Sequence, residues 1–412
     1  MAAHRVGDRL ARPSVLWITQ EPPDRSLGGG NIRQAHLVTA LAHRADVTLL
    51  VMGTLADDEV RDAVAEVIDL PGVHLPEPRW RPLRRLFDLW IAARGPREVV
   101  LTARCRRVMR PIVRRVEPQF DLVIASHPGM AALRPRRPAA RWLAQLHHVS
   151  SARARQEHDV TPGRRQRWLL DREVTHAAHF ESHLLATFDG VVVVSPEDAA
   201  LLRAERARGP VLVVPNGVDL DHYRPSPLPR EPAIVMTGSF QYGPNADGAV
   251  WFCDEVLPLV RAAVPEATLT LVGREPRAEV RELATRPGVS LHADVPDVAP
   301  WLARARLTVV PLRIGTGTRL KALESMAAGR PVVGTSIGLE GLGVEDGVHA
   351  HVADTAPQLA ERVIRVLRDD PHAAALAAAG RRLVEERFDW EAVGRPFADV
   401  VVELAGMAGR VR

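Results

Sequence analysis

Residues 311–331 read PLRIGTGTRLKALESMAAGRP, and this stretch shows best how the chain is built. The apolar run that leads into it predicts a buried strand, and Gly315 and Gly317 break the chain directly afterwards. Residues 319–328 then have helical spacing, and a glycine and a proline stop the helix. The order strand, glycine loop, helix is typical of one unit of an open parallel sheet.

The same alternation runs through both halves of the chain. Strands are expected at 14–19, 47–52, 122–125, 142–146, 191–194, 211–214, 234–236, 268–272, 307–311 and 332–334. Further helices are expected at 32–43, 246–257, 373–387 and about 391–407. A stretch with four prolines in ten residues, 223–232, separates the two series and suits a linker. We therefore predict an α/β protein of two Rossmann-like domains, 1–222 and 233–387.

Composition limits the class of protein. The chain has 412 residues, 46% of them hydrophobic, which is more than one core usually organises. No apolar run approaches the roughly 20 residues of a membrane span, and the first residues lack the apolar core of a secretory signal. Cys105 and Cys253 form neither a disulfide framework nor a metal-site spacing. These features predict a cytoplasmic protein.

The loop at 311–331 is the strongest candidate for chemistry, because parallel sheets bind ligands beyond the carboxyl ends of their strands. The expected anion-binding residues here are Gly315, Thr316, Gly317, Thr318 and Arg319. Lys321 and Glu324 are three residues apart on the following helix. An ammonium near a diphosphate and a carboxylate one turn deeper would suit a sugar nucleotide. An ordinary surface Lys–Glu pair is the alternative.

A second glycine run, at Gly28, Gly29 and Gly30, precedes the helix expected at 32–43. It is a weaker candidate for a loop that faces a ligand, because a plain flexible turn explains it equally well. The run does not match G-x-G-x-x-G, so a dinucleotide site is unsupported.

At the end of the first stretch, LESMAAGRP (323–331) resembles the L-E-[AS]-M-A-x-G-x-P motif of glycosyltransferase family 4, retaining enzymes of the GT-B fold. VVPNGVD at 213–219 and TGSF at 237–240 are also similar to that family. In the family the glutamate of the motif binds the donor ribose, which implies this role for Glu324. A second family glutamate, which helps bind the donor sugar, falls on Thr316, so the sequence departs from the pattern there.

The resemblance implies the rest of the organisation. It implies two domains that face each other across a cleft, with the donor in the second domain and the acceptor in the first. It also implies that the segment 388–412 returns to the first domain. The remaining donor residues implied by the resemblance are Gly238, Ser239, Arg274 and Val295. Family enzymes often carry an arginine and a lysine after the glycine of TGSF, and here Arg319 and Lys321 are expected to supply that charge instead.

Histidines follow two strands of the first domain. His147, after the strand at 142–146, resembles the family's histidine beside the donor sugar, and His148 takes the next polar position. A histidine at such a strand end can donate to a sugar hydroxyl or handle an acceptor proton. A structural histidine is the alternative. His127 is a weaker candidate at a neighbouring strand end.

The expected function is transfer of a sugar from a nucleotide-sugar donor to an acceptor hydroxyl, with no cofactor. No metal is expected, because the D-x-D string at 219–221 suits a turn. The acceptor stays open between a saccharide, a lipid-linked saccharide and a small molecule, in polysaccharide, glycolipid or secondary-metabolite biosynthesis. A nucleotide-sugar epimerase or phosphorylase on the same fold and a non-catalytic binding protein are the alternatives.

Basic residues are concentrated in one segment. Net charge is +4, yet residues 79–115 hold twelve arginines against Asp88 and Glu98. Lys321 is the single lysine of the chain, beside 53 arginines. Two interpretations are open for the segment: a peripheral contact with anionic lipid on the inner face of the cell membrane, or an arginine-biased solvated surface. No recognised nucleic-acid motif accompanies the charge.

Overall fold

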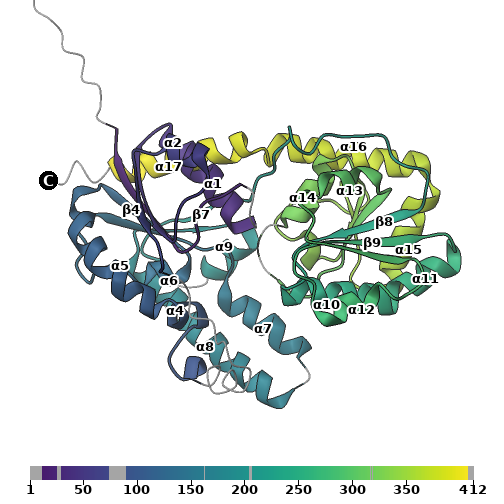
Figure 1. Cartoon of the computed structure of the whole chain (residues 1–412), viewed down its shortest axis with the longest axis horizontal. Helices are drawn as coiled ribbons and strands as arrows, with labels where there is room; N and C mark the ends of the chain where they lie inside the picture. Colours follow the sequence, from purple (N-terminus) through teal and green to yellow (C-terminus); the bar gives the residue numbers. More distant parts are fainter. Residues whose placement is uncertain are drawn as a thin grey trace, which may run out of the picture.

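The computed structural model describes residues 12–25, 29–73, 90–161, 163–203, 207–315, 317 and 319–406. Two parallel sheets lie in separate lobes, which confirms the predicted α/β class with two Rossmann-like domains (Figure 1). Of the candidate site residues, Gly28, Thr316 and Thr318 lie outside the described residues, as does the first part of the arginine-rich segment, 79–89.

The N-terminal sheet has seven strands. Their spatial order is β3 (Glu66–Leu70), β2 (Asp46–Met52), β1 (Ser14–Thr19), β4 (Leu122–Ser126), β5 (Arg141–Gln145), β6 (Gly190–Val193) and β7 (Val211–Val213). The helices around it are α1 (Gly29–Ala42), α2 (Asp58–Ala63), α4 (Arg97–Leu101), α5 (Ala103–Val116), α6 (Pro128–Ala131), α7 (Ser150–Val160), α8 (Arg164–Thr187) and α9 (Pro196–Arg203), with a 3-10 turn, η1, at Glu117–Gln119. The central strands are continuous apolar runs because helices cover both faces of the sheet.

The C-terminal sheet has six strands. Their spatial order is β10 (Val289–Ala293), β9 (Thr268–Gly273), β8 (Ala233–Thr237), β11 (Leu307–Val310), β12 (Val332–Gly334) and β13 (His351–Val352). Its helices are α10 (Gly243–Trp251), α11 (Leu257–Ala263), α12 (Ala278–Leu283), α13 (Ala299–Arg304), α14 (Leu320–Ala327), α15 (Ala356–Arg368) and α16 (Asp370–Arg387). A π-helical turn, η2 (Phe252–Val256), joins α10 to α11, and a 3-10 turn, η3, spans Ile337–Leu339.

The last helix, α17 (Trp390–Gly406), leaves the C-terminal domain and packs on α1 of the N-terminal domain (Figure 1). Trp390 stacks on His36 with 4.5 Å between ring centroids. Phe397 meets Trp17 of β1 edge-on at 6.1 Å. A Cβ at Gly394 would lie 2.7 Å from the Cβ of Ala40, so only glycine permits this helix contact. Helix α17 is thus part of the N-terminal core.

The chain crosses between the domains twice, and the two crossings lie side by side. Val218 and Asp389 form a parallel bridge, and the Val218 N–H donates to the Phe388 carbonyl at 2.7 Å. Gly217 lies against Trp390 so closely that a Cβ would be 2.6 Å from its ring. The proline-rich segment after the first crossing is fixed to the C-terminal domain by the buried Arg330, which donates to the Pro227 carbonyl at 3.3 Å.

Candidate active site

The single lysine of the chain, Lys321, lies in the first turn of α14, just after the glycine loop that follows β11. Lys321 Nζ donates to Asn245 Oδ1 at 2.5 Å, and Asn245 Nδ2 donates to the Ser239 carbonyl at 2.8 Å. Burial, with Arg319 nearby, lowers the pKa of Lys321 to about 7. Asn245 thus holds the ammonium against the loop that follows β8.

Gly238, at the carboxyl end of β8, makes this approach possible. Its φ of +151° is unfavourable for residues with a side chain. A Cβ there would lie 2.9 Å from both Lys321 Nζ and Asn245 Nδ2. The structure therefore brings together Gly238, Ser239 and Lys321, three residues expected at the diphosphate.

Arg319 turns another way. Its Nε donates to the Ile337 carbonyl at 2.9 Å, and one terminal nitrogen lies 3.3 Å from Glu340 Oε2. Burial lowers the pKa of Arg319 and raises the pKa of Glu340 to about 7. Of the two cations expected to meet a diphosphate, Lys321 is the one held at the β8 loop.

Glu324 lies one turn deeper in α14, where burial raises its pKa. Tyr223 forms a side-chain hydrogen bond with this carboxylate and so opposes the rise. Next to it, His222 Nε2 lies 3.0 Å from Asp297 Oδ1. The sequence did not indicate Tyr223, which lies 101 positions before Glu324 in what was expected to be linker.

Arg274 and Val295, the remaining two residues expected at the nucleotide-sugar donor, lie in the loops that follow the neighbouring strands β9 and β10. Val295 is partly buried in a small apolar cluster that also contains Tyr223 and Trp301. Arg274 is exposed just after β9, and its carbonyl accepts from the Phe240 N–H at 2.9 Å. Val295 therefore lies near Tyr223, the hydrogen-bond partner of Glu324.

On the N-terminal side, His147 lies two residues past β5. Its Nε2 is 3.2 Å from Ser126 Oγ, and its ring stacks on His127 with centroids 4.2 Å apart. Burial, with His127 and Arg33 nearby, lowers the pKa of His147 well below its ordinary value. The imidazole is therefore neutral near pH 7 and can offer both a donor and an acceptor.

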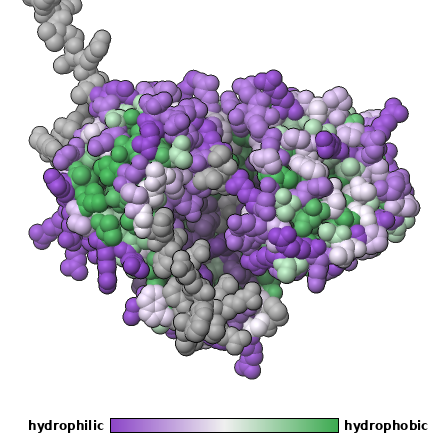
Figure 2. All heavy atoms as spheres, viewed as in Figure 1, coloured by the Kyte–Doolittle hydropathy of each residue, from purple (hydrophilic) through white to green (hydrophobic). Residues whose placement is uncertain are grey.

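Three glycines lie around His147, and two of them, Gly29 and Gly317, bring the two domains into contact. A Cβ at Gly30 would lie 3.6 Å from His147 Nδ1, and one at Gly317 would lie 3.1 Å from the His147 carbonyl oxygen. A Cβ at Gly29 would clash with Leu320 at 2.3 Å. Gly29 and Gly30 form the first turn of α1, so the helix begins earlier than the sequence indicated. This face of the molecule is hollowed between the lobes, and hydrophilic residues surround the hollow (Figure 2).

His148 points away from this contact. Its Nε2 is 3.0 Å from Glu98 Oε1, and Arg153 lies 3.7 Å from the same oxygen. His148 and Arg153 hold the pKa of Glu98 down at about 2 despite its burial. The two adjacent histidines thus differ: the His147 carbonyl lies against Gly317 of the other domain, and the His148 side chain hydrogen-bonds Glu98 inside its own domain.

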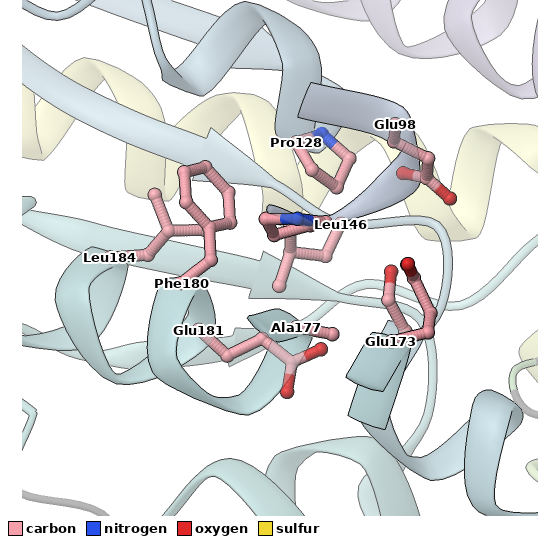
Figure 3. Close-up of a pocket in the computed structure, with 10 residues that line it drawn as sticks. Glu98, Pro128, Leu146, Glu173, Ala177, Phe180, Glu181 and Leu184 are labelled. Atoms are coloured by element: carbon pink, nitrogen blue, oxygen red, sulfur yellow. The ribbon is translucent and has the colours of Figure 1, made fainter. Parts of the chain in front are cut away.

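The carboxylate of Glu98 lines a small cavity inside the N-terminal domain. Figure 3 shows Leu146, Phe180 and Leu184 on one side of it and Glu98 with Glu173 on the other. The cavity measures about 10 Å³, room for about one water molecule. A sugar does not fit there, so this cavity is not the substrate site.

Two N-terminal residues that the sequence did not indicate reach the donor loop. Gln156 Oε1, from α7, accepts from the Gly315 N–H at 2.7 Å. Asp198, in the first turn of α9, lies with Oδ2 3.8 Å from the position of a Cβ at Gly317. The spacing Ser195-x-x-Asp198 after a strand is a helix-start signal, and the Asp198 N–H does donate to Ser195 Oγ at 3.0 Å.

The D-x-D string forms a turn. Asp219 Oδ1 accepts from the N–H groups of Asp221 and His222, both at 2.9 Å. Across the described ranges, no group of three or more His, Cys, Asp or Glu side chains is arranged to hold a metal ion. None of the described helices combines the length and apolar character needed to cross a membrane.

Two family models match the chain, one for each domain. The model of Glycosyltransferase Family 4 matches residues 27–222, and that of Glycosyl transferases group 1 matches residues 231–369. A D-inositol 3-phosphate glycosyltransferase of Xylanimonas cellulosilytica is 27% identical, over 96% of this chain and 98% of that protein.

Solved structures share the fold at lower identity. Sucrose-phosphate synthase of Thermosynechococcus elongatus superimposes with a TM-score of 0.70 at 20% identity, over 96% of this chain and 100% of that one. HepE of Anabaena, in complex with UDP and glucose, gives a TM-score of 0.63 at 14% identity, over 95% and 100%. The chain is therefore a glycosyltransferase of the GT-B fold, similar to glycosyltransferase family 4.

Proposed function

We propose that this glycosyltransferase takes its sugar from a nucleoside-diphosphate sugar held by the C-terminal domain. It transfers the sugar, with retention of anomeric configuration, to a hydroxyl of an acceptor held by the N-terminal domain. The observation that carries the proposal is Lys321, a partly buried basic residue whose partner at the β8 loop is the neutral oxygen of Asn245. A diphosphate is the ligand that such a positive charge suits best.

The residues of the loop divide the work on the donor. Lys321, with a pKa of about 7, becomes fully protonated when phosphate charge approaches, and then stabilises the negative charge that develops on the leaving diphosphate. Gly238 lets the phosphates come close to the backbone. Glu324 accepts hydrogen bonds from the ribose hydroxyls in place of the Tyr223 hydroxyl.

Neutral His147 faces the sugar from the other domain. Because its Nδ1 points toward the first turn of α1, it can hydrogen-bond a sugar hydroxyl between the two domains. Lys321 and the loop amides neutralise the diphosphate in this scheme, so the proposal includes no metal ion and no cofactor. The relatives support the donor class: HepE was solved with UDP and glucose.

The test is a panel of UDP-glucose, UDP-N-acetylglucosamine, ADP-glucose and GDP-mannose, each with its nucleoside diphosphate, in a thermal-shift assay. A true donor should raise the melting temperature by mass action. Product analysis with the donor so identified, and with EDTA present, then gives the anomeric configuration of the product. An epimerised donor, a sugar phosphate formed from free phosphate, or turnover that needs metal would contradict the proposal. Binding with neither transfer nor donor hydrolysis would indicate a non-catalytic binding protein.

We also propose that α5 brings this cytoplasmic enzyme to an anionic membrane surface. Cys105, Met109 and Val113 of α5 are buried. The exposed residues of the helix include five arginines and no acidic residue: Arg104, Arg107, Arg110, Arg114 and Arg115. Vesicles that contain phosphatidylserine should sediment with the protein at low salt and less at moderate salt. Equal recovery with pure phosphatidylcholine vesicles would contradict this second proposal.

A further inference from the structure

Asp198 is a buried carboxylate at the boundary between the domains. It sits in the first turn of α9, directly after the carboxyl end of β6, and is 1% exposed. Gly317, in the donor loop of the other domain, lies against it, since a Cβ there would be 3.8 Å from Asp198 Oδ2. Because Gly317 and the carboxylate are on different domains, a rotation that separates the domains would open this side of Asp198 to the cleft.

By distance and angle, neither carboxylate oxygen of Asp198 has a well-formed hydrogen-bond partner among the described residues, and the nearby Ser195 side chain only partly offsets the rise in its pKa. In a capping box this side chain would accept from the backbone N–H of Ser195, and that bond is not made here. A buried carboxylate without donors costs free energy, and such groups are rare in folded proteins. A purely structural role therefore leaves Asp198 unexplained.

The surroundings favour a neutral ligand with hydroxyl groups. Arg319 is near enough to act on Asp198 electrostatically, but it also pairs with Glu340, and the exposed Glu197 adds negative charge. Two further acidic groups so close disfavour a phosphate at this point. Hydroxyl groups are donors that a carboxylate accepts without a change in net charge.

We propose that Asp198 is a further substrate-binding residue, whose carboxylate accepts hydrogen bonds from hydroxyl groups of the donor's sugar ring. The proposal rests on the proposed function, because it places the sugar between the donor loop and His147. It also fits the sequence, since Thr316 of the same loop cannot offer a carboxylate. The N-terminal domain then supplies the acidic group that the loop lacks.

The first test compares Asp198→Asn with Glu197→Gln, an exposed neighbour on the same helix turn that loses the same charge. Calorimetry with the nucleotide sugar that gives the largest shift in the panel, and with its nucleoside diphosphate, measures the two affinities. We expect Asp198→Asn to lower the affinity for the nucleotide sugar by about tenfold and the affinity for the nucleoside diphosphate by less than about twofold. Glu197→Gln should change neither.

Stability without added ligand is the second readout. Burial raises the pKa of Asp198 from an ordinary value of 3.8 to about 6. The ionised carboxylate therefore destabilises the folded protein above about pH 6, and this penalty is lost as the pH falls through about 6 toward 3.8. Arg319, His148, Glu197 and Glu340 are the titratable groups that act on it electrostatically. Asp198→Asn should thus raise the melting temperature by about 2 °C near pH 7.5, with a smaller rise near pH 4.5.

Four results would overturn the inference. A lower melting temperature with unchanged sugar affinity would mean that Asp198 is structural. An equal loss of affinity for the nucleotide sugar and for the nucleoside diphosphate would mean that Asp198 acts on the diphosphate through Arg319. If the wild-type chain binds the diphosphate and not the nucleotide sugar, Asp198 has no sugar to hold. If no nucleotide binds at all, the proposed function fails, and the ligand assigned to Asp198 fails with it.

Discussion

The two sides of the domain contact differ in how their polar groups are held. On the C-terminal side, each important group has a protein partner: Lys321 has Asn245, Glu324 has Tyr223, and Arg319 has Glu340. On the N-terminal side, Asp198 has no well-formed hydrogen bond among the described residues and interacts only with the nearby Ser195 side chain, and His147 is 3.2 Å from a single hydroxyl, that of Ser126.

This difference separates two tasks. Groups that are already bonded keep their geometry, so the C-terminal side should bind the nucleotide with little rearrangement. Groups without partners gain most when a ligand supplies them, so the N-terminal side should act on the sugar. Nucleotide affinity and turnover should therefore respond to different substitutions.

The largest effect is expected for Glu324→Ala. Two ribose hydrogen bonds to a charged acceptor are worth about 2–3 kcal/mol, so nucleoside diphosphate affinity should fall by roughly 30- to 150-fold. The melting temperature without ligand should barely change. Glu361→Ala, an exposed glutamate on α15, is the control. If calorimetry finds unchanged nucleoside diphosphate affinity in Glu324→Ala, Glu324 does not bind the ribose, and the task assigned to the C-terminal side is wrong.

A smaller effect is expected for Lys321→Arg. A planar guanidinium is larger than an ammonium, and Lys321 Nζ lies where even a Cβ on Gly238 would be only 2.9 Å away. We expect kcat/KM to fall at least about tenfold, or roughly 1.4 kcal/mol of transition-state stabilisation, and further in Lys321→Ala. Steady-state kinetics measure this.

Arg382→Lys, on the exposed side of α16, exchanges the same two groups away from the site and should be neutral. Wild-type kinetics in Lys321→Arg would mean that the one lysine is an accident of composition.

The smallest effect is expected for His147→Ala, and it should appear in kcat. Loss of one hydrogen bond to a sugar hydroxyl should lower kcat by about three- to tenfold and leave diphosphate affinity intact. Since the pKa of His147 is already well below its ordinary value, this histidine should add no loss of kcat between about pH 8 and 6. Single-turnover kinetics would separate the chemical step from release of product.

His148→Ala is the matched comparison for this histidine. It breaks the ion pair with Glu98, so it should lower the melting temperature more than it lowers kcat. A larger loss of kcat in His148→Ala than in His147→Ala would reverse the assignment of the two residues.

The sequence predicted what depends on nearby residues. The helix expected at 319–328 is α14, Leu320–Ala327, because a glycine and a proline stop it within a few positions. Lys321 and Glu324 lie on this helix as expected, since their spacing is local, and their roles at the donor stay predictions. The short strands β3, β10 and β13 were missed because each is partly exposed or brief and has little apolar signal.

The sequence could not predict contacts between distant segments. Asn245 meets Lys321 across 76 positions, and Gln156 meets Gly315 across 159. No periodicity in the sequence encodes such distances. The glycine run was read as a turn because glycine disfavours helices, yet Gly29 and Gly30 are helical. Their lack of side chains is used for the close approach of Leu320 and His147.

The paired crossings of the chain also determine how the cleft can open. A lobe that is joined to its neighbour by two segments lying side by side is expected to rotate about one hinge axis close to both segments. We expect this axis to pass near the bridge that joins the two segments, between Val218 and Asp389. Points far from it travel furthest for a given turn, while points beside it hardly move. The return of α17 to the N-terminal domain therefore provides the second covalent connection. If the chain were cut near Asp389, one segment alone would join the lobes, and they could twist as well as rotate about the hinge axis.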